Sequence, residues 1–194
     1  MSVEQLFDDG SDAGNVYPDE SRDVLEARDR SITAHGDWRE EMALSFNFVA
    51  GHQWHDDDKS RLEENDRPAV VFNRTAPIID AVAGYELDNR REVHYRPRGV
   101  ADGDGMIAEA FTEMARYVRD GIDANDEESE AYRDLLICGM GWTETWVDYD
   151  EDPLGTIRIT RLPPDEMRWD ENARAGNLSD AEWIQRETWW EPAD

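Results

Sequence analysis

The spacing of apolar residues changes along this 194-residue chain, and the change constrains the fold more than any other feature. Between residues 107 and 122 the apolar positions recur every three or four residues, which predicts an amphipathic helix over residues 105–123. From Trp142 the period becomes two, which is typical of strands. The apolar positions of the helix are Ile107, Phe111, Met114, Ala115, Val118 and Ile122.

A β-hairpin is predicted where the period becomes two. The runs GWTETWVDYD and TIRITRL alternate apolar and polar residues and flank the turn-rich segment DEDPLG. Two prolines end the second strand, and the runs EMRWD and AEWIQRETWW are predicted to add short strands to the same small sheet. The charged side chains expected to pair across the exposed face are Glu144, Asp148, Arg158 and Arg161.

The N-terminal part of the chain carries a second helical pattern, predicted over residues 20–50. We expect a bend near His35 and an end at Gly51, since glycine often ends a helix. The second half has too many apolar residues for one thin stripe, which predicts that it is well buried. A short helical turn is predicted near residues 59–64. Residues 1–17 are rich in Asp, Gly and Ser and are interpreted as a mobile acidic arm.

A further helix is predicted over residues 127–139, where Asn125 or Asp126 can cap the first turn. It is expected to end in the turn from Gly139 to Gly141. The predicted fold is α+β, with helices packed against a small, mostly antiparallel sheet built from the hairpin and its neighbours. The main helices are expected at roughly 20–50, 74–89, 105–123 and 127–139.

Residues 67–98 join an apolar run, a capped helix and much of the positive charge. Residues 69–72 include two β-branched valines, which predicts a buried strand. Asn73 can cap the following helix with its side-chain oxygen. Pro77 falls in the first turn, where its missing N–H does little harm. This helix is predicted over residues 74–89, with one apolar face that packs on another surface.

Arginines gather around that helix, and the segment after it is predicted to be an edge strand because Val93, Tyr95 and Pro97 alternate with polar residues. The simpler interpretation is a solvated strand whose charges pair with the abundant carboxylates. The functional interpretation is a subunit contact, in which guanidinium groups of one protomer meet carboxylates of the next. Direct contact with DNA ranks third, because a few arginines do not dominate the field of so acidic a chain. The candidate contact residues are Arg74, Arg90, Arg91, Arg96 and Arg98.

The charge balance limits the classes of partner. The chain has 47 acidic and 20 basic residues, a net charge of -27 at pH 7, which opposes wrapping of nucleic acid. Lys59 is the one lysine, so nearly every cation is a guanidinium suited to fixed carboxylate pairing. Such acidity is also typical of halophilic proteins. An apolar fraction of 39% with eight tryptophans still predicts a folded core.

The acidic loops match no metal-binding pattern. The run DYDEDPLG resembles an EF-hand loop at its start, but Pro153 and Ile159 stand where that loop needs glycine and glutamate. Asp102 and Asp104 could belong to a two-metal nuclease centre, yet neither Lys nor His is close to them in the sequence. A charged turn and a loop before a helix are the favoured interpretations.

The remaining reactive side chains are also interpreted as structural. Cys138, the one cysteine, excludes an internal disulfide and is expected to be a small buried residue before a turn. His52 and His55 lie in a polar loop with no cysteine nearby, so a zinc pair is not favoured. These patterns predict that the chain is not an enzyme and holds no cofactor or metal. No apolar run reaches the ~20 residues that span a bilayer, and no signal peptide is recognisable, which predicts a cytoplasmic origin.

Three motifs occur in an order that resembles the N-terminal part of the portal proteins of short-tailed, podovirus-type bacteriophages. They are FVAGHQW at 48–54, RPAVVFNRTAPIIDAVAGYELDNR at 67–90 and CGMGW at 138–142. Weaker similarity continues through LPPDEMRWD and LSDAEWIQRETWW, so the resemblance covers residues 38–190. The combination is more specific than any one motif. Such portals are several-fold longer, so residues 18–194 are interpreted as one α+β module of a truncated chain.

The resemblance implies a structural virion protein, the wing-like region of a subunit that forms a ring, usually a dodecamer, at one capsid vertex. DNA is packaged and ejected through such a ring. The implied partners are other copies of the chain, the capsid protein, the terminase, tail or head-completion proteins and, transiently and non-specifically, double-stranded DNA, with no membrane. The implied location is the virion, and the host cytoplasm during assembly. Two alternatives stay open: a metal-dependent nuclease or hydrolase using the Asp-rich loops, and a free-standing acidic interaction module.

Overall fold

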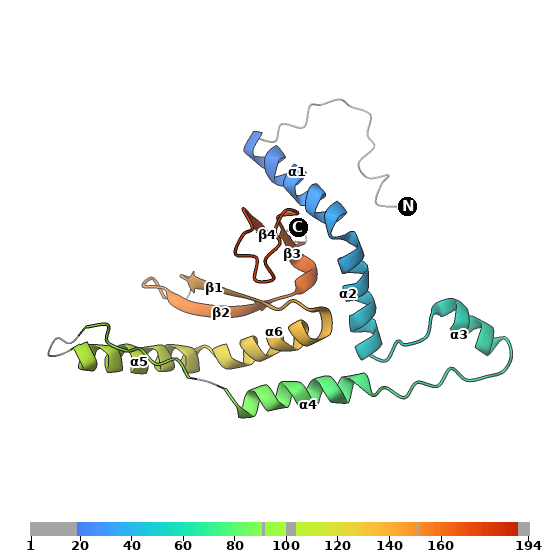
Figure 1. The fold of residues 1–194 in the computed structure, drawn as a ribbon, viewed down its shortest axis with the longest axis horizontal. Helices are drawn as coiled ribbons and strands as arrows, with labels where there is room; N and C mark the ends of the chain where they lie inside the picture. Colours follow the sequence, from blue (N-terminus) through green and yellow to red (C-terminus); the bar gives the residue numbers. More distant parts are fainter. Residues whose placement is uncertain (1–18, 91, 100–103, 151, 190–194) are drawn as a thin grey trace. The chain divides into compact units, whose positions relative to one another are not determined.

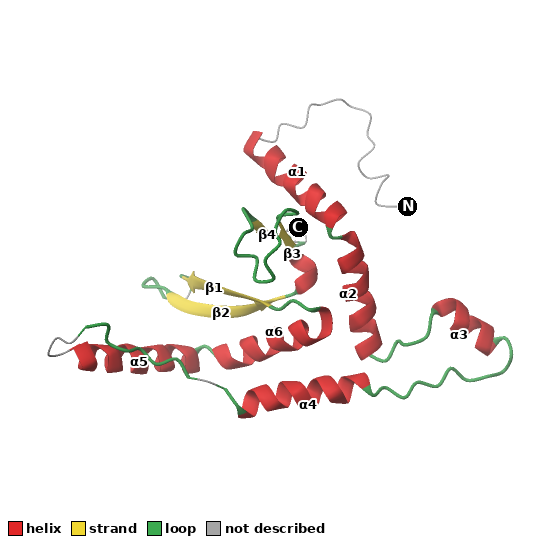
Figure 2. Ribbon diagram, in the orientation of Figure 1, coloured by secondary structure: helices red, strands yellow, loops and turns green. Residues whose placement is uncertain are grey.

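The computed structural model describes residues 19–90, 92–99, 104–150 and 152–189. These residues form six α-helices and two sheets of two strands each, an α+β fold as predicted (Figure 1, Figure 2). The chain divides into two compact units. One combines Met1–His35 with Arg168–Gln185, and the other combines Gly36–Met167 with Arg186–Asp194. The predicted arm over residues 1–17 lies outside the described residues.

The first unit is built on α1, Asp19–Ala34, and the segment Arg168–Gln185, in which a loop joins two short strands. The buried hydroxyl of Ser31 accepts a hydrogen bond of 3.3 Å from the backbone N–H of Trp169. The side chain of Arg30 forms an ion pair of 2.7 Å with Glu171. These contacts attach the loop to one side of the helix.

The second unit contains the other five α-helices of the described chain. The predicted helix is interrupted at His35, between α1 and α2, and Gly51 follows α2 with φ +97°, which confirms the predicted end at Gly51. The short helix predicted near residues 59–64 is also present, and it begins earlier. The helices are α2 (Gly36–Val49), α3 (Asp56–Glu63), α4 (Thr75–Asp88), α5 (Asp104–Gly121) and α6 (Ala124–Cys138).

Asn73 caps α4 as predicted. Its Oδ1 accepts hydrogen bonds of 3.2 Å from the backbone N–H groups of Thr75 and Ala76, which have no partner inside the helix. Its Nδ2 donates to the carbonyl of Val49 over 2.7 Å, which also ties the start of α4 to the end of α2. The predicted cap of α6 is wrong, because α6 begins at Ala124 and takes Asn125 and Asp126 into its first turn.

The predicted buried strand at residues 69–72 is also wrong. These residues form an extended loop with no strand partner among the described residues, and the Phe72 side chain is 81% exposed. Trp54 holds the loop by donating from Nε1 to the carbonyl of Val70 over 3.2 Å. Two valines favour extended backbone, but a strand also requires a neighbouring strand to pair with, which this loop lacks.

The predicted hairpin is confirmed. Strand β1 (Trp142–Asp148) pairs antiparallel with β2 (Thr156–Leu162), so that Trp142 lies opposite Leu162. The predicted charge pairing across it is correct for Asp148 and Arg158, whose ion pair is 3.5 Å long. It is wrong for the other two side chains, because Arg161 binds Asp134 of α6 and Glu144 binds Arg186.

The two later strands do not extend the hairpin into one sheet. Strand β3 (Met167–Trp169) pairs with β4 (Ile184–Arg186) as a separate sheet. A 3-10 turn at Pro164–Glu166 separates β2 from β3. Proline lacks the N–H that would continue the ladder, so the chain leaves the first sheet at this point.

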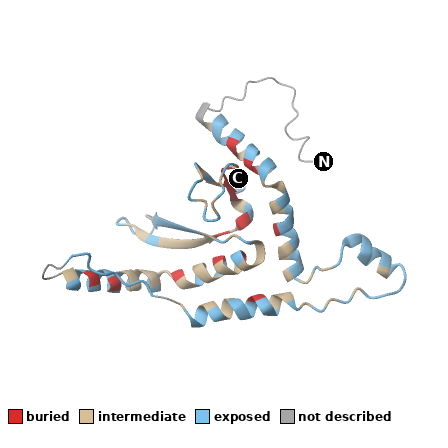
Figure 3. Ribbon diagram, viewed as in Figure 1, coloured by how far each residue is buried: buried red, intermediate tan, exposed pale blue. Residues whose placement is uncertain are grey.

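In the second unit α6 lies between the hairpin and α4, and α2 packs on α6 as well (Figure 1). The buried apolar side chains are few and spread over these elements (Figure 3). Helix α2 corresponds to the second half of the helical pattern predicted over residues 20–50. The prediction that this half is well buried is wrong, because Met42 is the one buried residue of α2 and Leu44 is 62% exposed. None of the described helices is both long enough and apolar enough to cross a membrane.

Candidate functional site

The structure separates the predicted arginine cluster into two groups. Arg90 lies half-buried just after α4, whereas Arg74, Arg96 and Arg98 are exposed. Arg91 lies outside the described residues. Their use at a subunit contact stays a prediction, and the four described arginines have different surroundings.

The segment that carries Arg96 and Arg98 is not the predicted edge strand. Residues 92–99 form no strand and run along α5 instead. The backbone N–H of Tyr95 donates to Oγ1 of Thr112 over 3.0 Å, and the Tyr95 ring lies 5.8 Å from the Phe111 ring. The alternation that indicated a strand reflects an extended segment held against a helix, where one backbone donor is satisfied by a side chain.

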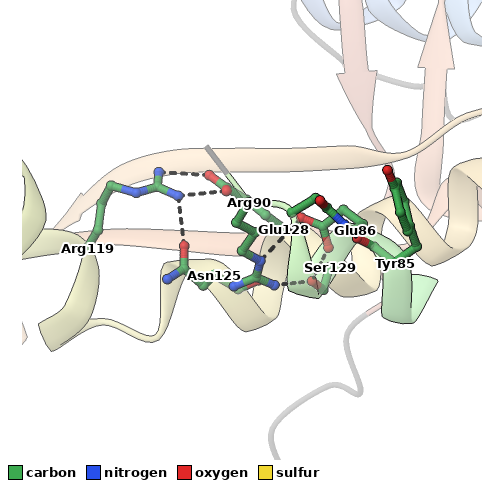
Figure 4. A network of polar contacts seen from close by, with 8 residues as sticks. Tyr85, Glu86, Arg90, Arg119, Asn125, Glu128 and Ser129 are labelled. Carbon is green, nitrogen blue, oxygen red and sulfur yellow. Dashed lines mark hydrogen bonds and ion pairs between the residues drawn. The ribbon is translucent and has the colours of Figure 1, made fainter. Parts of the chain in front are cut away.

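Arg90 joins α4 to α6 through a polar network (Figure 4). Its Nε donates to the Glu86 carboxylate over 3.2 Å, and its Nη2 donates to the carbonyl of Asn125 over 2.6 Å and to the hydroxyl of Ser129. The Ser129 hydroxyl donates to the second carboxylate oxygen of Glu86 over 2.8 Å. Several donors of Arg90 are therefore already used within the chain.

Arg119 extends the same network from α5. Its guanidinium binds both carboxylate oxygens of Glu128 at 2.8 and 2.7 Å, and it donates to Oδ1 of Asn125 over 3.1 Å. The hydrogen bonds to Glu128 raise the pKa of Arg119 above its ordinary value. A guanidinium that binds both oxygens of one carboxylate fixes the direction of the contact as well as its length. The pair of Arg119 and Glu128 therefore orients α5 relative to α6.

A cavity of about 270 Å³ lies beside this network. Arg116 lines it and binds both Glu92, at 2.7 Å, and Glu113, at 2.8 Å. The hydrogen bond from Arg116 lowers the pKa of Glu92. The walls carry guanidinium groups and carboxylates that neutralise one another, which is typical of a structural ion-pair network rather than a poised acid and base.

The acidic loops show ordinary turn chemistry. In the hairpin turn, Oδ1 of Asp148 accepts from the N–H of Asp150 over 3.0 Å, and Oδ1 of Asp152 accepts from the N–H of Leu154 over 2.9 Å. Asp102 lies outside the described residues. Across the residues that the structure does describe, no group of three or more His, Cys, Asp or Glu side chains could hold a metal ion.

Cys138 lies at the end of α6, half-buried, and its thiol donates to the carbonyl of Met140 over 3.2 Å. Burial raises the pKa of the Cys138 thiol. A thiol with a raised pKa forms little of the nucleophilic thiolate, so this geometry supports the structural interpretation of Cys138.

The polar network was only partly visible in the sequence. Glu86 and Arg90 stand four residues apart, a spacing at which side chains on a helix meet. Ser129 lies 39 positions after Arg90, and no local pattern brings the two together. The spacing of Glu86 and Arg90 therefore indicates their ion pair, but no local pattern indicates the partners of Arg90 on α6.

Comparison with known proteins identifies the family. A model of the family described as Phage P22-like portal protein matches residues 25–194. The chain belongs to this family of phage portal proteins. The portal protein of Helicobacter pylori bacteriophage KHP30 is 23% identical over 139 residues, which is 69% of this chain and 22% of that protein.

Membership confirms the resemblance inferred from the three motifs, and the match begins before the first of them. Membership of a phage portal protein family supports a structural role for the chain. The ion-pair network around Arg90 and Arg119 is consistent with that role, because it holds helices of the second unit together.

Proposed function

We propose that this chain forms part of a portal subunit that assembles as a ring, in its full form a dodecamer, at one vertex of the capsid. Phage DNA is packaged and ejected through that ring. The observation that carries the proposal is the family match over residues 25–194. The proposed partners are further copies of the chain, the capsid protein, the terminase and tail or head-completion proteins. The chain acts in the host cytoplasm during assembly and then in the virion.

The ion pairs between arginines and carboxylates within the chain support a ring channel that does not bind DNA tightly. Retention of duplex DNA depends on Lys and Arg that can neutralise phosphates. In the described chain many guanidinium groups are instead engaged by carboxylates, and the net charge is -27. Contact with the duplex is therefore transient and non-specific. Arginines in ion pairs within the chain include Arg30, Arg116, Arg119, Arg133, Arg161 and Arg186.

The acidity also sets the conditions for assembly. Copies of a chain with net charge -27 repel one another, and salt reduces that repulsion as the screening length falls from about 10 Å at 0.1 M to about 3 Å at 1 M. Assembly is therefore favoured at high salt, as expected of a protein adapted to a halophilic host.

The test is the assembly state of the full-length gene product. Light scattering coupled to size-exclusion chromatography should give a mass that is a multiple of the subunit mass, and negative-stain images should show rings with a central channel. The same preparation at 0.1 M and 1 M salt should assemble more completely at 1 M. A product that stays monomeric at every concentration and salt tested would overturn the proposal. Tight attachment to duplex DNA at 1 M salt would overturn its account of DNA passage.

A further inference from the structure

Helix α5 leaves its apolar stripe uncovered. The positions that it buries are Ala108 and Thr112, on the side where residues 92–95 run. The side chains of Ile107, Phe111 and Met114 are 57%, 48% and 55% exposed. These three residues are spaced four and three apart, so they lie on one face of the helix. We call them the α5 stripe. A helix with a continuous apolar face packs that face on something in its working state.

Helix α4 carries a second stripe with the same spacing. Ile78, Val82 and Tyr85 are 64%, 40% and 70% exposed, whereas the buried residue of this helix is Ile79. Tyr85 takes no part through its ring in the polar contacts of Figure 4, which occupy the side of α4 that faces α6. We call Ile78, Val82 and Tyr85 the α4 stripe. The second unit therefore presents two exposed apolar stripes on two different helices.

Charge distinguishes the surroundings of the two stripes. Arg96 and Arg98 border the α5 stripe, where they line a hollow of about 310 Å³ together with Asp104, Tyr95, Ile107 and Phe111. The tilted contact between the Tyr95 and Phe111 rings, whose centroids are 5.8 Å apart, holds this arginine-bearing segment beside the stripe. On α4, the exposed Asp88 stands three residues after Tyr85, on the next turn of the helix. The border of the α5 stripe is therefore net basic, with two arginines and one aspartate. The α4 stripe has Asp88 at its C-terminal end and the exposed Arg74 four residues before Ile78.

We propose that the α5 stripe of one copy of this chain packs against the α4 stripe of a second copy, with Arg96 and Arg98 facing Asp88 of that copy. The inference rests on the proposed function, because a contact between two different surfaces, repeated from copy to copy, is the kind that can close a ring. Apolar packing supplies the attraction, and the charges at its border select the partner surface.

Disulfide trapping tests the pairing of the stripes. In a Cys138→Ser background, protein carrying Met114→Cys is mixed with protein carrying Tyr85→Cys, oxidised and analysed by non-reducing electrophoresis and mass spectrometry. The expected product is the mixed disulfide between the two variants. Leu154→Cys, at a hairpin position that is 90% exposed, is the matched control and should not cross-link to Met114→Cys. A product dominated by Met114→Cys joined to itself, or by the Leu154→Cys control, would overturn the proposal.

Charge reversal tests it without a new cysteine. The double variant Arg96→Glu/Arg98→Glu should weaken self-association at least about tenfold in sedimentation velocity, since like charges placed opposite one another are strongly unfavourable. Adding Asp88→Arg should restore part of the loss. The double variant Arg61→Glu/Arg174→Glu changes the net charge equally at two exposed positions that belong to neither stripe nor its border, and it is the control. Equal weakening by both double variants would overturn the proposal.

Different results would overturn the pairing of the stripes and the proposed function. If the unaltered protein forms rings and neither the mixed disulfide nor the charge effect is observed, the pairing of stripes is wrong and the ring stands. If the unaltered protein forms no assembly under any condition, the proposed function fails together with the inference.

Discussion

The carboxylate of Asp134, on α6, accepts two hydrogen bonds from the guanidinium of Arg161, on β2, at 2.5 and 2.8 Å. Asp134 is 3% exposed. The backbone N–H of Arg161 also donates to the Glu127 carboxylate over 2.6 Å. One position of the hairpin is therefore attached to α6 through both its side chain and its main chain, and the hydrogen bonds to Asp134 raise the pKa of Arg161.

Replacing Arg161 by alanine should strongly destabilise the second unit. The change leaves the Asp134 carboxylate buried without its counter-charge, and removing one partner of a buried ion pair costs several kcal/mol. Because the Arg161 side chain is 32% exposed, we expect the lower end, about 3 kcal/mol in the free energy of unfolding. Urea denaturation followed by circular dichroism measures the loss.

Arg133→Ala is the matched control for that change, because Arg133 precedes Asp134 on the same helix. Its ion pair with Asp80 is 2.8 Å long, but the Asp80 side chain is 60% exposed. Exposed pairs contribute about 1 kcal/mol or less, so this variant should stay close to the unaltered protein. Equal losses for Arg161→Ala and Arg133→Ala would show that burial of Asp134 does not decide the effect.

Gly141→Ala should be poorly tolerated. A Cβ at Gly141 would lie 2.1 Å from the backbone carbonyl oxygen of Ala131, which α6 holds in place. Relieving that clash requires movement of the β1 start away from α6, and such overpacking costs about 1–3 kcal/mol. Gly36→Ala is the control, since a Cβ there meets nothing within 4 Å. Thermal unfolding should show a lower midpoint for Gly141→Ala alone, and equal midpoints would contradict this explanation.

Features of the fold that depend on near neighbours were predictable from the sequence. Asn73 was identified as a cap because its side chain reaches N–H groups two and three residues later. The hairpin followed from a period of two on both sides of a turn. The prediction of a strand at residues 69–72 was wrong because their composition indicates extended backbone but does not show whether a second strand lies beside it.

The candidate site shows the same division between local and distant contacts. Arg161 was expected to pair across the hairpin, but its partner Asp134 lies 27 positions earlier on a helix. The sequence predicted an apolar face on α4 and another on α5, yet Phe111 of α5 is 48% exposed in the chain by itself. Periodicity gives the direction of an apolar face, and it does not show whether the covering surface belongs to the same chain.

Ser129→Ala should weaken the network between α4 and α6 by a modest amount. The serine hydroxyl accepts from Arg90 and donates to Glu86 over 2.8 Å, so its loss removes both contacts while the pair of Arg90 and Glu86 remains. Hydrogen bonds to charged groups contribute about 1.5–3 kcal/mol when buried, and this partly exposed site should give the lower value. Chemical denaturation checks the loss. Ser60→Ala, on the exposed side of α3, is the control and should have little effect.

Lowering the pH should destabilise the first unit through His35. The His35 ring lies 4.3 Å from the Trp169 ring, and its Nδ1 lies 3.2 Å from the hydroxyl of Ser31. Burial lowers the pKa of His35 below the ordinary 6.5, although the Ser31 carbonyl and the carboxylates of Glu171 and Asp170 act in the opposite direction. Below about pH 6.5 the unfolded chain therefore binds more protons than the folded chain. The free energy of unfolding decreases as the pH is lowered through this range.

That dependence should be confined to the interval from about pH 6.5 down to the folded-state pKa of His35, because above 6.5 the ring is neutral in both states. Nuclear magnetic resonance of the His35 ring protons should give a midpoint below 6.5. A His35→Asn variant keeps a polar side chain and cannot titrate, so its unfolding midpoint should be flat between pH 7.5 and 5. The neighbouring carboxylates of Asp170 and Glu171 do not produce this signal, since their lowered pKa values place their protonation at lower pH. A midpoint above 6.5, or the same slope in both proteins, would show that burial beside Trp169 does not control the His35 proton.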